Sequence, residues 1–222
     1  MICSIIHHWI LENLNGISKH KYTNSMITVN SKKELKKLIE QRIEEQGPTC
    51  DLNDIDVSNV TDMSLLFLDS EFNGDISQWN VSNVWNMASM FENSSFNGDI
   101  SKWNVGNVKN MSGMFQYSKF NRDISNWNVS KVKDMGFMFN NSLFIGDLSK
   151  WDVSSVENMS YMFYNSPFNG DISNWNTKSL KFATFMFYGS KFSGDVSRWD
   201  LSNVENMYNI FTESPLDWRR IK

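Results

Sequence analysis

Residues 72–91 read FNGDISQWNVSNVWNMASMF, and residues 96–115 read FNGDISKWNVGNVKNMSGMF. The second stretch repeats the first after 24 positions, and this spacing continues along the chain without an insertion. A tryptophan marks the register in six copies, at Trp79, Trp103, Trp127, Trp151, Trp175 and Trp199. A fixed period of about 20–29 residues, with apolar residues in fixed positions, predicts a solenoid with one turn per repeat.

Other columns of identical residues keep the same register. Aspartate recurs at Asp75, Asp99, Asp123, Asp147, Asp171 and Asp195, and Asp51 begins an earlier copy that lacks the tryptophan. Phenylalanine marks seven copies, at Phe67, Phe91, Phe115, Phe139, Phe163, Phe187 and Phe211. One copy cannot bury its own apolar face, whereas a neighbour in the same register buries it, so we expect an isolated copy to be unfolded.

Each copy contains two apolar patterns and a corner. Residues 76–81, with the pattern IxxWxV, match the spacing of a leucine-rich repeat and predict a short parallel strand. Residues 84–91, with the pattern VxxMxxMF, predict a short helical or 3₁₀ segment. In the FNGD corner we expect a positive φ at Gly74, although Arg122 replaces this glycine in one copy. The prediction is an α/β repeat solenoid, leucine-rich-repeat-like, with seven coils.

The first 50 residues do not repeat and predict an N-terminal cap. The segment SKKELKKLIEQRIEEQG predicts an amphipathic helix over residues 31–46, with Ser31 and Glu34 as a capping box. Residues 26–29 are expected to add a flanking strand, and the cap covers the apolar end of the first coil. The repeats occupy residues 51–218, where the last copy degenerates toward a C-terminal cap, and a basic tail occupies residues 219–222.

Charge is unevenly distributed along the chain. Residues 1–50 hold seven basic and five acidic residues, a net charge of +2, whereas residues 51–218 hold eleven and twenty, a net charge of −9. Because affinity for nucleic acids depends largely on positive charge, the acidic repeats disfavour direct nucleic-acid binding. No apolar run reaches the ~18–20 residues of a membrane span. The first residues lack the features of a secretory signal, which predicts a cytoplasmic protein.

The repeated pattern FNGDISxWNVSNVxNMxxMF resembles a known family over residues 51–218. It is similar to the bacterial surface-protein repeats related to the BspA-like leucine-rich-repeat proteins, as is the entry from KKELKKLI into LNDIDVSNVTDM. The resemblance implies adhesion or host binding at the bacterial cell surface, and it brings no catalytic residues with it.

Three repeated columns allow both a functional and a structural interpretation. The aspartates could form a calcium ladder, but calcium takes about six to eight oxygen ligands, so turn capping is favoured. The tryptophans could stack sugars or bases, but they occupy the position of a core leucine, so burial is favoured. A structural polar ladder is expected from a third column, which consists of Asn80, Asn104, Asn128, Asp152, Asn176 and Asp200.

The sequence holds no recognised catalytic motif. The patterns GxSxG, HExxH, GxGxxG and the P-loop are absent. The three histidines, His7, His8 and His20, lie outside the repeats, and Cys3 and Cys50 form neither a zinc motif nor a disulfide framework. We therefore predict a protein without enzyme activity, cofactor or metal.

A few positions depart from the repeat by becoming aromatic. One small or polar column turns aromatic in three consecutive copies, a column three residues later turns to tyrosine in two copies, and one more polar residue is replaced. In that order, these residues are Phe137, Tyr161 and Phe185, then Tyr164 and Tyr188, then Phe182. Since residues three apart are neighbours on a helical turn, we predict an aromatic partner-binding patch. Local repacking is the alternative.

The function expected from these features is a non-enzymatic scaffold that binds a macromolecule, with a protein as the favoured partner. One alternative is an adhesin-like module that binds glycan or host matrix. A second alternative is an acidic decoy of nucleic acid that inhibits a nucleic-acid enzyme. The oligomeric state and the identity of the partner do not follow from the sequence.

Overall fold

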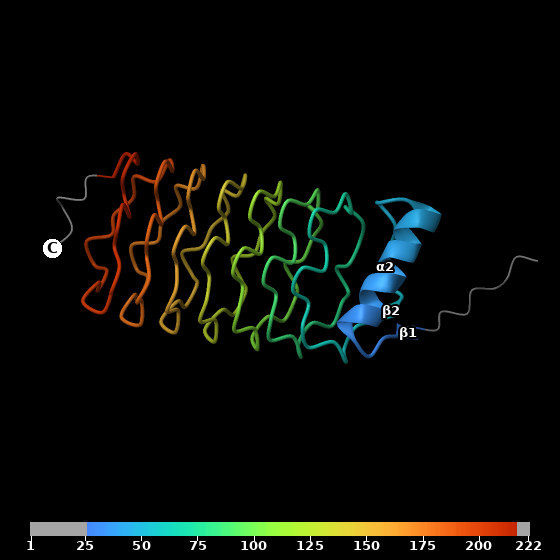
Figure 1. Ribbon diagram of the computed structural model, residues 1–222. Coiled ribbons are helices and arrows are strands. Elements are labelled where there is room, and N and C mark those ends of the chain that lie inside the picture. Colours follow the sequence, from blue (N-terminus) through green and yellow to red (C-terminus); the bar gives the residue numbers. More distant parts are fainter. Residues whose placement is uncertain (1–25, 217–222) are drawn as a thin grey trace, which may run out of the picture.

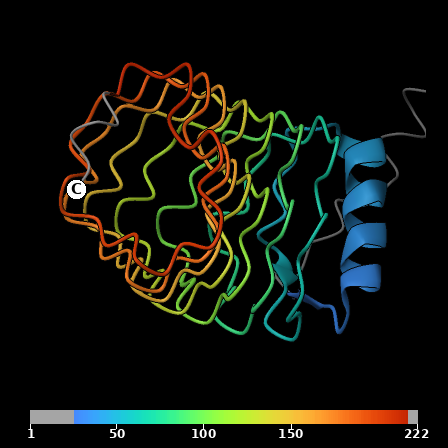
Figure 2. The same cartoon turned by 60° about the vertical axis from the view of Figure 1, so that its left-hand side comes forward.

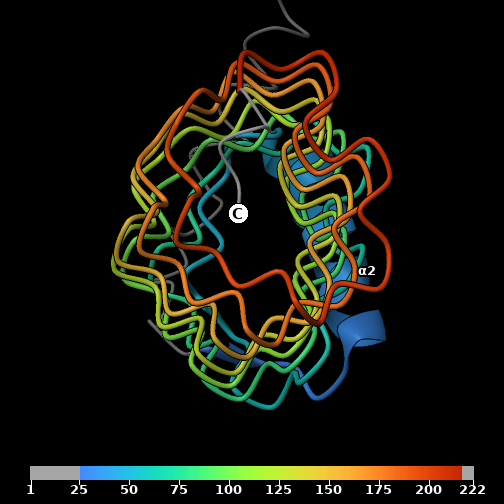
Figure 3. The ribbon, with the colours of Figure 1, turned by 90° about the vertical axis from the view of Figure 1, so that its left-hand side faces the viewer.

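The computed structural model of the protein describes residues 26–216. The predictions made for Cys3, the three histidines and the basic tail lie outside the described residues. Figure 1 shows a helix at one end and the repeat copies following one another along a single direction. Seen along that direction, successive copies follow nearly the same outline (Figure 3). The regular repeat is confirmed, and most of each copy is irregular chain with turns.

Helix α2 (Lys32–Gln46) lies at the predicted place. The Ser31 hydroxyl accepts a hydrogen bond from the Glu34 N–H at 3.2 Å, and the Glu34 carboxylate accepts one from the Asn30 N–H at 2.8 Å. Gly47, with a φ of 87°, ends the helix, and its N–H donates to a carbonyl of the last turn. Both ends of the helix are therefore specified by residues that the sequence identifies, Ser31 and Glu34 at the start and Gly47 at the end.

One face of α2 packs on the repeats. Leu35 and Ile39 are buried in the same apolar core as the first copies, and Figure 2 shows the helix standing across their end. Two short strands join the N-terminal segment to the repeats. Strand β1 (Ile27–Thr28) pairs in parallel with β2 (Ile55–Asp56).

Neighbouring copies are joined by the same hydrogen bonds at each junction. Backbone N–H groups two residues apart donate to carbonyl groups of the next copy. At the junction between the first two copies, Met63, Leu65, Phe67 and Asp69 donate to Asn86, Ala88, Met90 and Glu92 at 2.9–3.0 Å. Parallel bridges mark the same register from Asp62↔Asn86 to Phe182↔Asn206. This repeated bonding satisfies polar backbone groups that stacking would otherwise bury without partners.

The predicted secondary structure within each copy is wrong. At residues 76–81, where a strand was expected, the chain turns, because the Trp79 N–H donates to the Ile76 carbonyl at 3.2 Å. Residues 84–91 form no helical segment: they hold the bridge at Asn86 and a left-handed residue at Ser89. A turn places residues three apart on one side of the chain, as a 3₁₀ helix does, so the apolar spacing fits both.

The glycine of the FNGD corner lies close to a buried ring and does not have a positive φ. Among the described glycines, only Gly47, Gly113 and Gly189 have a positive φ, so the expectation for Gly74 is wrong. A Cβ at Gly146 would lie 2.6 Å from Cζ of the Phe144 ring, so a side chain there would require the ring to shift, and Arg122 shows that one copy accommodates a side chain at this position. The glycine makes room for the buried ring.

Candidate partner-binding surface

The tryptophan column lies in the core, as predicted. Each of the six side chains is only 3–4% exposed, and each indole N–H donates to a carbonyl of the preceding copy. For Trp127 the acceptor is the Ile100 carbonyl, at 3.1 Å. Because the ring and its one donor are both used inside the protein, this column is unsuited to stacking sugars or bases.

The aspartate column caps turns, as predicted. Asp75 Oδ1 accepts a hydrogen bond from the Ser77 N–H at 2.8 Å, and the same bond recurs in the following copies. Bonds from the Ser77 backbone and side chain hold the pKa of Asp75 below its ordinary value. Within residues 26–216, no three His, Cys, Asp or Glu side chains are grouped closely enough to hold a metal ion.

The column that begins at Asn80 also serves local structure, but not as a ladder. Asn80 Oδ1 accepts bonds from the Ser82 N–H at 3.2 Å and from its hydroxyl at 2.7 Å. These bonds lie within one copy, so the expected ladder between copies is wrong for this column. A contact between copies occurs elsewhere, where the Asn86 side chain donates to Asp62 Oδ1 at 3.1 Å.

Five of the six residues predicted to bind a partner come together. The rings of Phe137 and Tyr161 stack with their centroids 4.6 Å apart and their planes at 6°. Tyr161 stacks in turn on Phe185, at 5.1 Å and 19°. Alongside, Tyr164 stacks on Tyr188 at 5.2 Å and 10°. We call these five residues the aromatic ribbon.

The two rows of the aromatic ribbon are in contact with each other and with solvent. Tyr161 and Tyr164 lie 5.7 Å apart, and Phe185 and Tyr188 lie 5.4 Å apart with their rings at 63°. Phe137 is 37% exposed, and the other four rings are half-buried. The ribbon is therefore one continuous, partly exposed aromatic surface that spans three copies.

One predicted residue lies apart from the ribbon, and one residue was missed. Phe182 occupies the bridged column between Asn158 and Asn206, and its ring contacts no other ring among the described residues. Tyr208, which is 64% exposed, lies edge-on against Phe185 at 5.4 Å and extends the aromatic surface. Tyr208 is the one large residue in a column of small residues, and this exception in the sequence could have predicted its role. The column consists of Ser64, Ala88, Ser112, Gly136, Ser160, Thr184 and Tyr208.

The backbone beneath the ribbon is left-handed. Phe137, Tyr161 and Phe185 have φ values of 61°, 59° and 53°, a region that bulky residues rarely occupy. Every copy is left-handed at this position and again four residues later. Column A consists of Leu65, Ser89, Gly113, Phe137, Tyr161, Phe185 and Asn209. Column B consists of Asp69, Asn93, Tyr117, Asn141, Asn165, Gly189 and Glu213.

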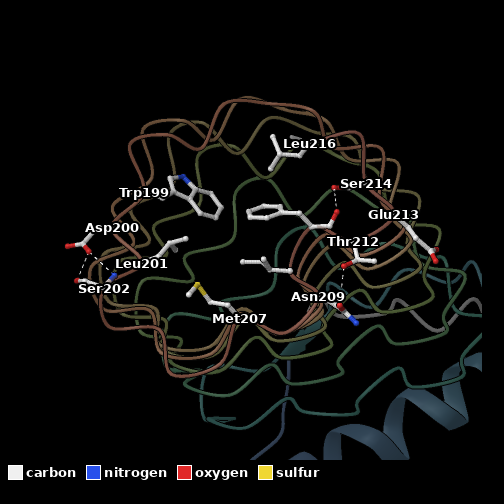
Figure 4. Close-up of a pocket in the computed structure, with 12 residues that line it drawn as sticks. Trp199, Asp200, Leu201, Ser202, Met207, Asn209, Thr212, Glu213, Ser214 and Leu216 are labelled. Atoms are coloured by element: carbon white, nitrogen blue, oxygen red, sulfur yellow. Dashed lines mark hydrogen bonds between the residues drawn. The ribbon is translucent and has the colours of Figure 1, made fainter. Parts of the chain in front are cut away.

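A pocket of about 960 Å³ lies at the last described copy. Figure 4 shows Trp199, Leu201, Met207 and Leu216 around it. In earlier copies the equivalent surface is covered by the next copy, as when the Trp175 ring stacks on Trp199 with centroids 6.1 Å apart. We therefore assign this pocket to the stacking face of the final copy and not to a ligand.

Comparison with known proteins identifies the family. In the part of the chain that the structure describes, no helix has both the length and the apolar character needed to cross a membrane. No curated protein and no solved structure matches the chain. A family model described as "Mycoplasma protein of unknown function, DUF285" matches residues 33–143 and again residues 117–216. Because these matches cover α2 and nearly all of the repeats, the chain belongs to the DUF285 family, with two overlapping copies of the family pattern.

Proposed function

We propose that this chain is a non-enzymatic repeat scaffold that binds a protein through the aromatic ribbon. The observation that carries the proposal is a conflict between backbone and side chain at three consecutive positions of column A. A left-handed conformation costs a residue with a Cβ about 1–2 kcal/mol, and glycine or asparagine lowers this cost. Column A already contains Gly113 and Asn209. Folding alone would favour such residues at Phe137, Tyr161 and Phe185, so their aromatic side chains favour a role in binding.

The chemistry of the ribbon favours a protein partner. Contiguous exposed aromatic surface is typical of protein interfaces, and tyrosine is enriched among the residues that dominate their binding energy. Sugars stack on open ring faces, whereas Tyr161 has a ring stacked on each side. A partner would therefore contact ring edges and hydroxyl groups, as protein surfaces commonly do. Glycan binding is therefore the second candidate function.

We also propose that the stacked copies form a solenoid related to the BspA-like leucine-rich-repeat proteins. The support is the constant register of the junctions and the sequence resemblance over residues 51–218. In a solenoid each copy continues the surface of its neighbour, which would make the ribbon a strip along one side. Adhesion and a bacterial surface location accompany that relation as part of the same proposal.

Affinity capture with matched variants tests the binding proposal. The full chain and the variant Tyr161→Asn/Tyr188→Gln are used to capture proteins from lysates of the native cell and its host, and bound proteins are identified by mass spectrometry. The same columns carry Asn209 and Gln116 in other copies, so the variant should fold. We expect it to lose a protein that the wild type retains. The control Leu143→Asn/Ile145→Asn removes two side chains that are 58% and 60% exposed but lie outside the ribbon, and it should retain that protein.

Other results would favour other functions. Equal capture by the folded double variant would place the interface elsewhere. A glycan-array signal that the same variant loses would favour the adhesin-like module, and displacement of a captured nuclease or polymerase by DNA would favour the acidic decoy. If the double variant unfolds, Tyr208→Ser tests the same surface at its most exposed ring.

A further inference from the structure

The two ends of the repeats present different backbone groups. In each described junction, N–H groups at alternate residues of one copy donate to carbonyl groups of the copy that follows. The first copy therefore presents carbonyl groups toward α2, and the last described copy presents N–H groups on the opposite side. At the first end, Lys32 Nζ donates to the Ser64 carbonyl at 3.2 Å, and Leu35 and Ile39 of α2 are buried in the shared core. Helix α2 therefore covers the carbonyl end.

At the other end, a row of N–H groups lacks the acceptors that its equivalents have. In the preceding copy, the equivalent groups donate to carbonyl groups of the last copy at 2.8–3.3 Å, and they belong to Ala183, Phe185, Phe187 and Gly189. One copy later, the same positions are Met207, Asn209, Phe211 and Glu213. Within residues 26–216, no acceptor is found for the N–H groups of these four residues. They are therefore placed to bond to carbonyl groups of an added segment.

Apolar side chains of the last copy are uncovered in the same place. Met207 is 47% exposed, whereas Met159 of the same column is fully buried. Leu201 is half-buried, whereas Val153 of its column is buried. Both Met207 and Leu201 line the pocket of about 960 Å³ in Figure 4. The last copy thus has open space beside its row of N–H groups, where each earlier copy is covered by the next one. We call this surface the end face.

We infer that the end face binds a repeat segment of a different protein, in the way that each copy of this chain binds the next. Every described junction shows what fits such a face, namely a segment that brings carbonyl groups at alternate residues and apolar side chains beside them. Main-chain hydrogen bonds combined with side-chain pockets are a common mode of peptide recognition. None of the five ribbon residues lines the pocket, so the end face is a second binding surface beyond the proposed function.

The polarity of the ends argues against a second intact copy of this chain as the occupant. Two end faces brought together would place N–H groups against N–H groups, and these cannot bond to each other. The complementary end of a second copy is covered by α2, where Lys32 also bonds to the side chains of Asp62 and Ser64. A repeat segment of another protein, without a helix over its carbonyl groups, meets both requirements.

Amide hydrogen exchange of the full ¹⁵N-labelled chain tests this inference with one repeat as the probe. The probe is a peptide of residues 100–123, a copy whose carbonyl groups accept the bonds of the preceding copy within this chain. In the free chain, we expect fast exchange at the amides of Met207, Asn209, Phe211 and Glu213. Millimolar peptide should slow this exchange about tenfold or more, in a saturable way.

Three results would overturn the inference. Slow exchange of the four amides in the free chain at every protein concentration would show that other residues of this chain already occupy the end face. Slow exchange that develops as the protein concentration rises would assign the face to a second copy. Fast exchange that persists at millimolar peptide would show that a repeat segment does not bind there.

Two altered peptides test whether the repeat pattern is recognised. A scrambled peptide of the same composition keeps the charge of the probe and should give no protection. The peptide with Phe115→Ser lacks a side chain that is fully buried in this chain, and it should bind about tenfold or more weakly. Equal protection by the scrambled peptide would reduce the effect to charge and overturn the inference.

Matched protein variants locate the binding at the end face. Met207→Lys puts a charge into the pocket and should abolish the protection, whereas Trp85→Lys changes a side chain that is 48% exposed in an early copy and should leave it unchanged. The ribbon variant Tyr161→Asn/Tyr188→Gln should also bind the peptide as the wild type does. Wild-type protection in the folded Met207→Lys chain would contradict the assignment. Failure of the peptide to bind would leave the ribbon proposal standing, and equal capture by the ribbon variant would leave the end face standing.

Discussion

Columns A and B share one backbone conformation and differ in the residues that adopt it. Their φ values lie between 50° and 64° in all seven copies. Column B follows the preference of the left-handed region, since five of its seven residues are Asn, Asp or Gly: Asp69, Asn93, Asn141, Asn165 and Gly189. Column A contains only two such residues, Gly113 and Asn209. The same left-handed backbone is therefore occupied mainly by Asn, Asp and Gly in column B but mainly by other residues in column A.

The difference separates the demands of folding from those of function. Column B shows what selection for a stable backbone alone would leave at a left-handed position. Column A departs from that composition where its rings stack and remain partly exposed, at Phe137, Tyr161 and Phe185. Column B thus shows which residues a left-handed position holds when only the backbone matters. Residues in column A that differ from this composition are candidates for a role in binding.

The largest expected loss of stability comes from a core substitution, and the losses in columns A and B are compared with it. Trp127→Ala should lower the free energy of unfolding by about 3–5 kcal/mol, because it leaves a cavity and removes the indole bond to the Ile100 carbonyl. Urea unfolding followed by circular dichroism measures the change. Trp85→Ala is the matched control, since Trp85 is 48% exposed and should cost far less. Similar losses in both variants would contradict the division between core and surface.

A smaller effect tests column B directly. Asn165→Val puts a β-branched side chain at a φ of 50° and should lower the free energy of unfolding by about 1–2 kcal/mol. Asn126→Val makes the same substitution at an exposed position outside the left-handed region and should be nearly neutral. If both variants unfold at the same urea concentration, backbone conformation does not determine the composition of column B.

Column A should respond more weakly still. Tyr161→Asn relieves strain worth about 1 kcal/mol and loses ring stacking worth about 0.5–1.5 kcal/mol, so the free energy of unfolding should change by less than about 1 kcal/mol. The same urea measurement gives the value. A loss as large as that of Trp127→Ala would show that the ring packs as part of the core, which would remove the reason to assign column A to binding.

The smallest effect per residue concerns the turn aspartates, which lie in neither column. The backbone N–H of Ser149 bonds to Asp147 and holds the pKa of its carboxyl below the ordinary value. A lowered pKa in the folded state gives stability that is present above the unfolded pKa of about 3.9 and is lost as pH falls through the folded value. Melting temperatures should therefore drop below about pH 4, and Asp147→Asn should make that drop shallower.

The acid titration also has a control in column A and a result that would contradict it. Tyr161→Asn should leave the pH dependence unchanged, because no turn carboxylate is altered. Calcium and a chelator should leave the melting temperature unchanged near neutral pH. A rise with calcium that Asp147→Asn diminishes would instead assign the aspartates to a calcium ladder.

The sequence predicts burial and register far better than backbone conformation. The tryptophan column and both ends of α2 follow from spacing and capping residues, because these signals name the side chains that make the contacts. The turns at residues 76–91 escaped prediction because apolar residues three apart fit turns and helices alike. The left-handed backbone of column A was hidden, since Leu65, Ser89 and Phe137 share no preference for it. Column B did carry a readable signal in its asparagines.

The candidate site was predictable in part because the sequence reveals the register of the repeats. Stacking along the chain follows from the register, so rings in one column had to meet, as Phe137 and Tyr161 do. Phe182 was misjudged because residues three apart are neighbours only within one turn. Phe185 and Tyr188 share a turn and are in contact, whereas Phe182 lies before that turn, in the bridged column.

The uniform junctions have a consequence for inheritance. Because every junction repeats one set of bonds without an insertion, a gene that gains or loses one repeat by recombination between its copies would still encode a chain whose junctions all match. Lineages could then vary in length without altering the fold. The copies between α2 and Phe137 contribute no ring to the aromatic ribbon. Each copy added or lost there would change the distance between α2 and the ribbon by the length of one repeat. The distance between α2 and the ribbon would thus evolve separately from the residues that form the ribbon.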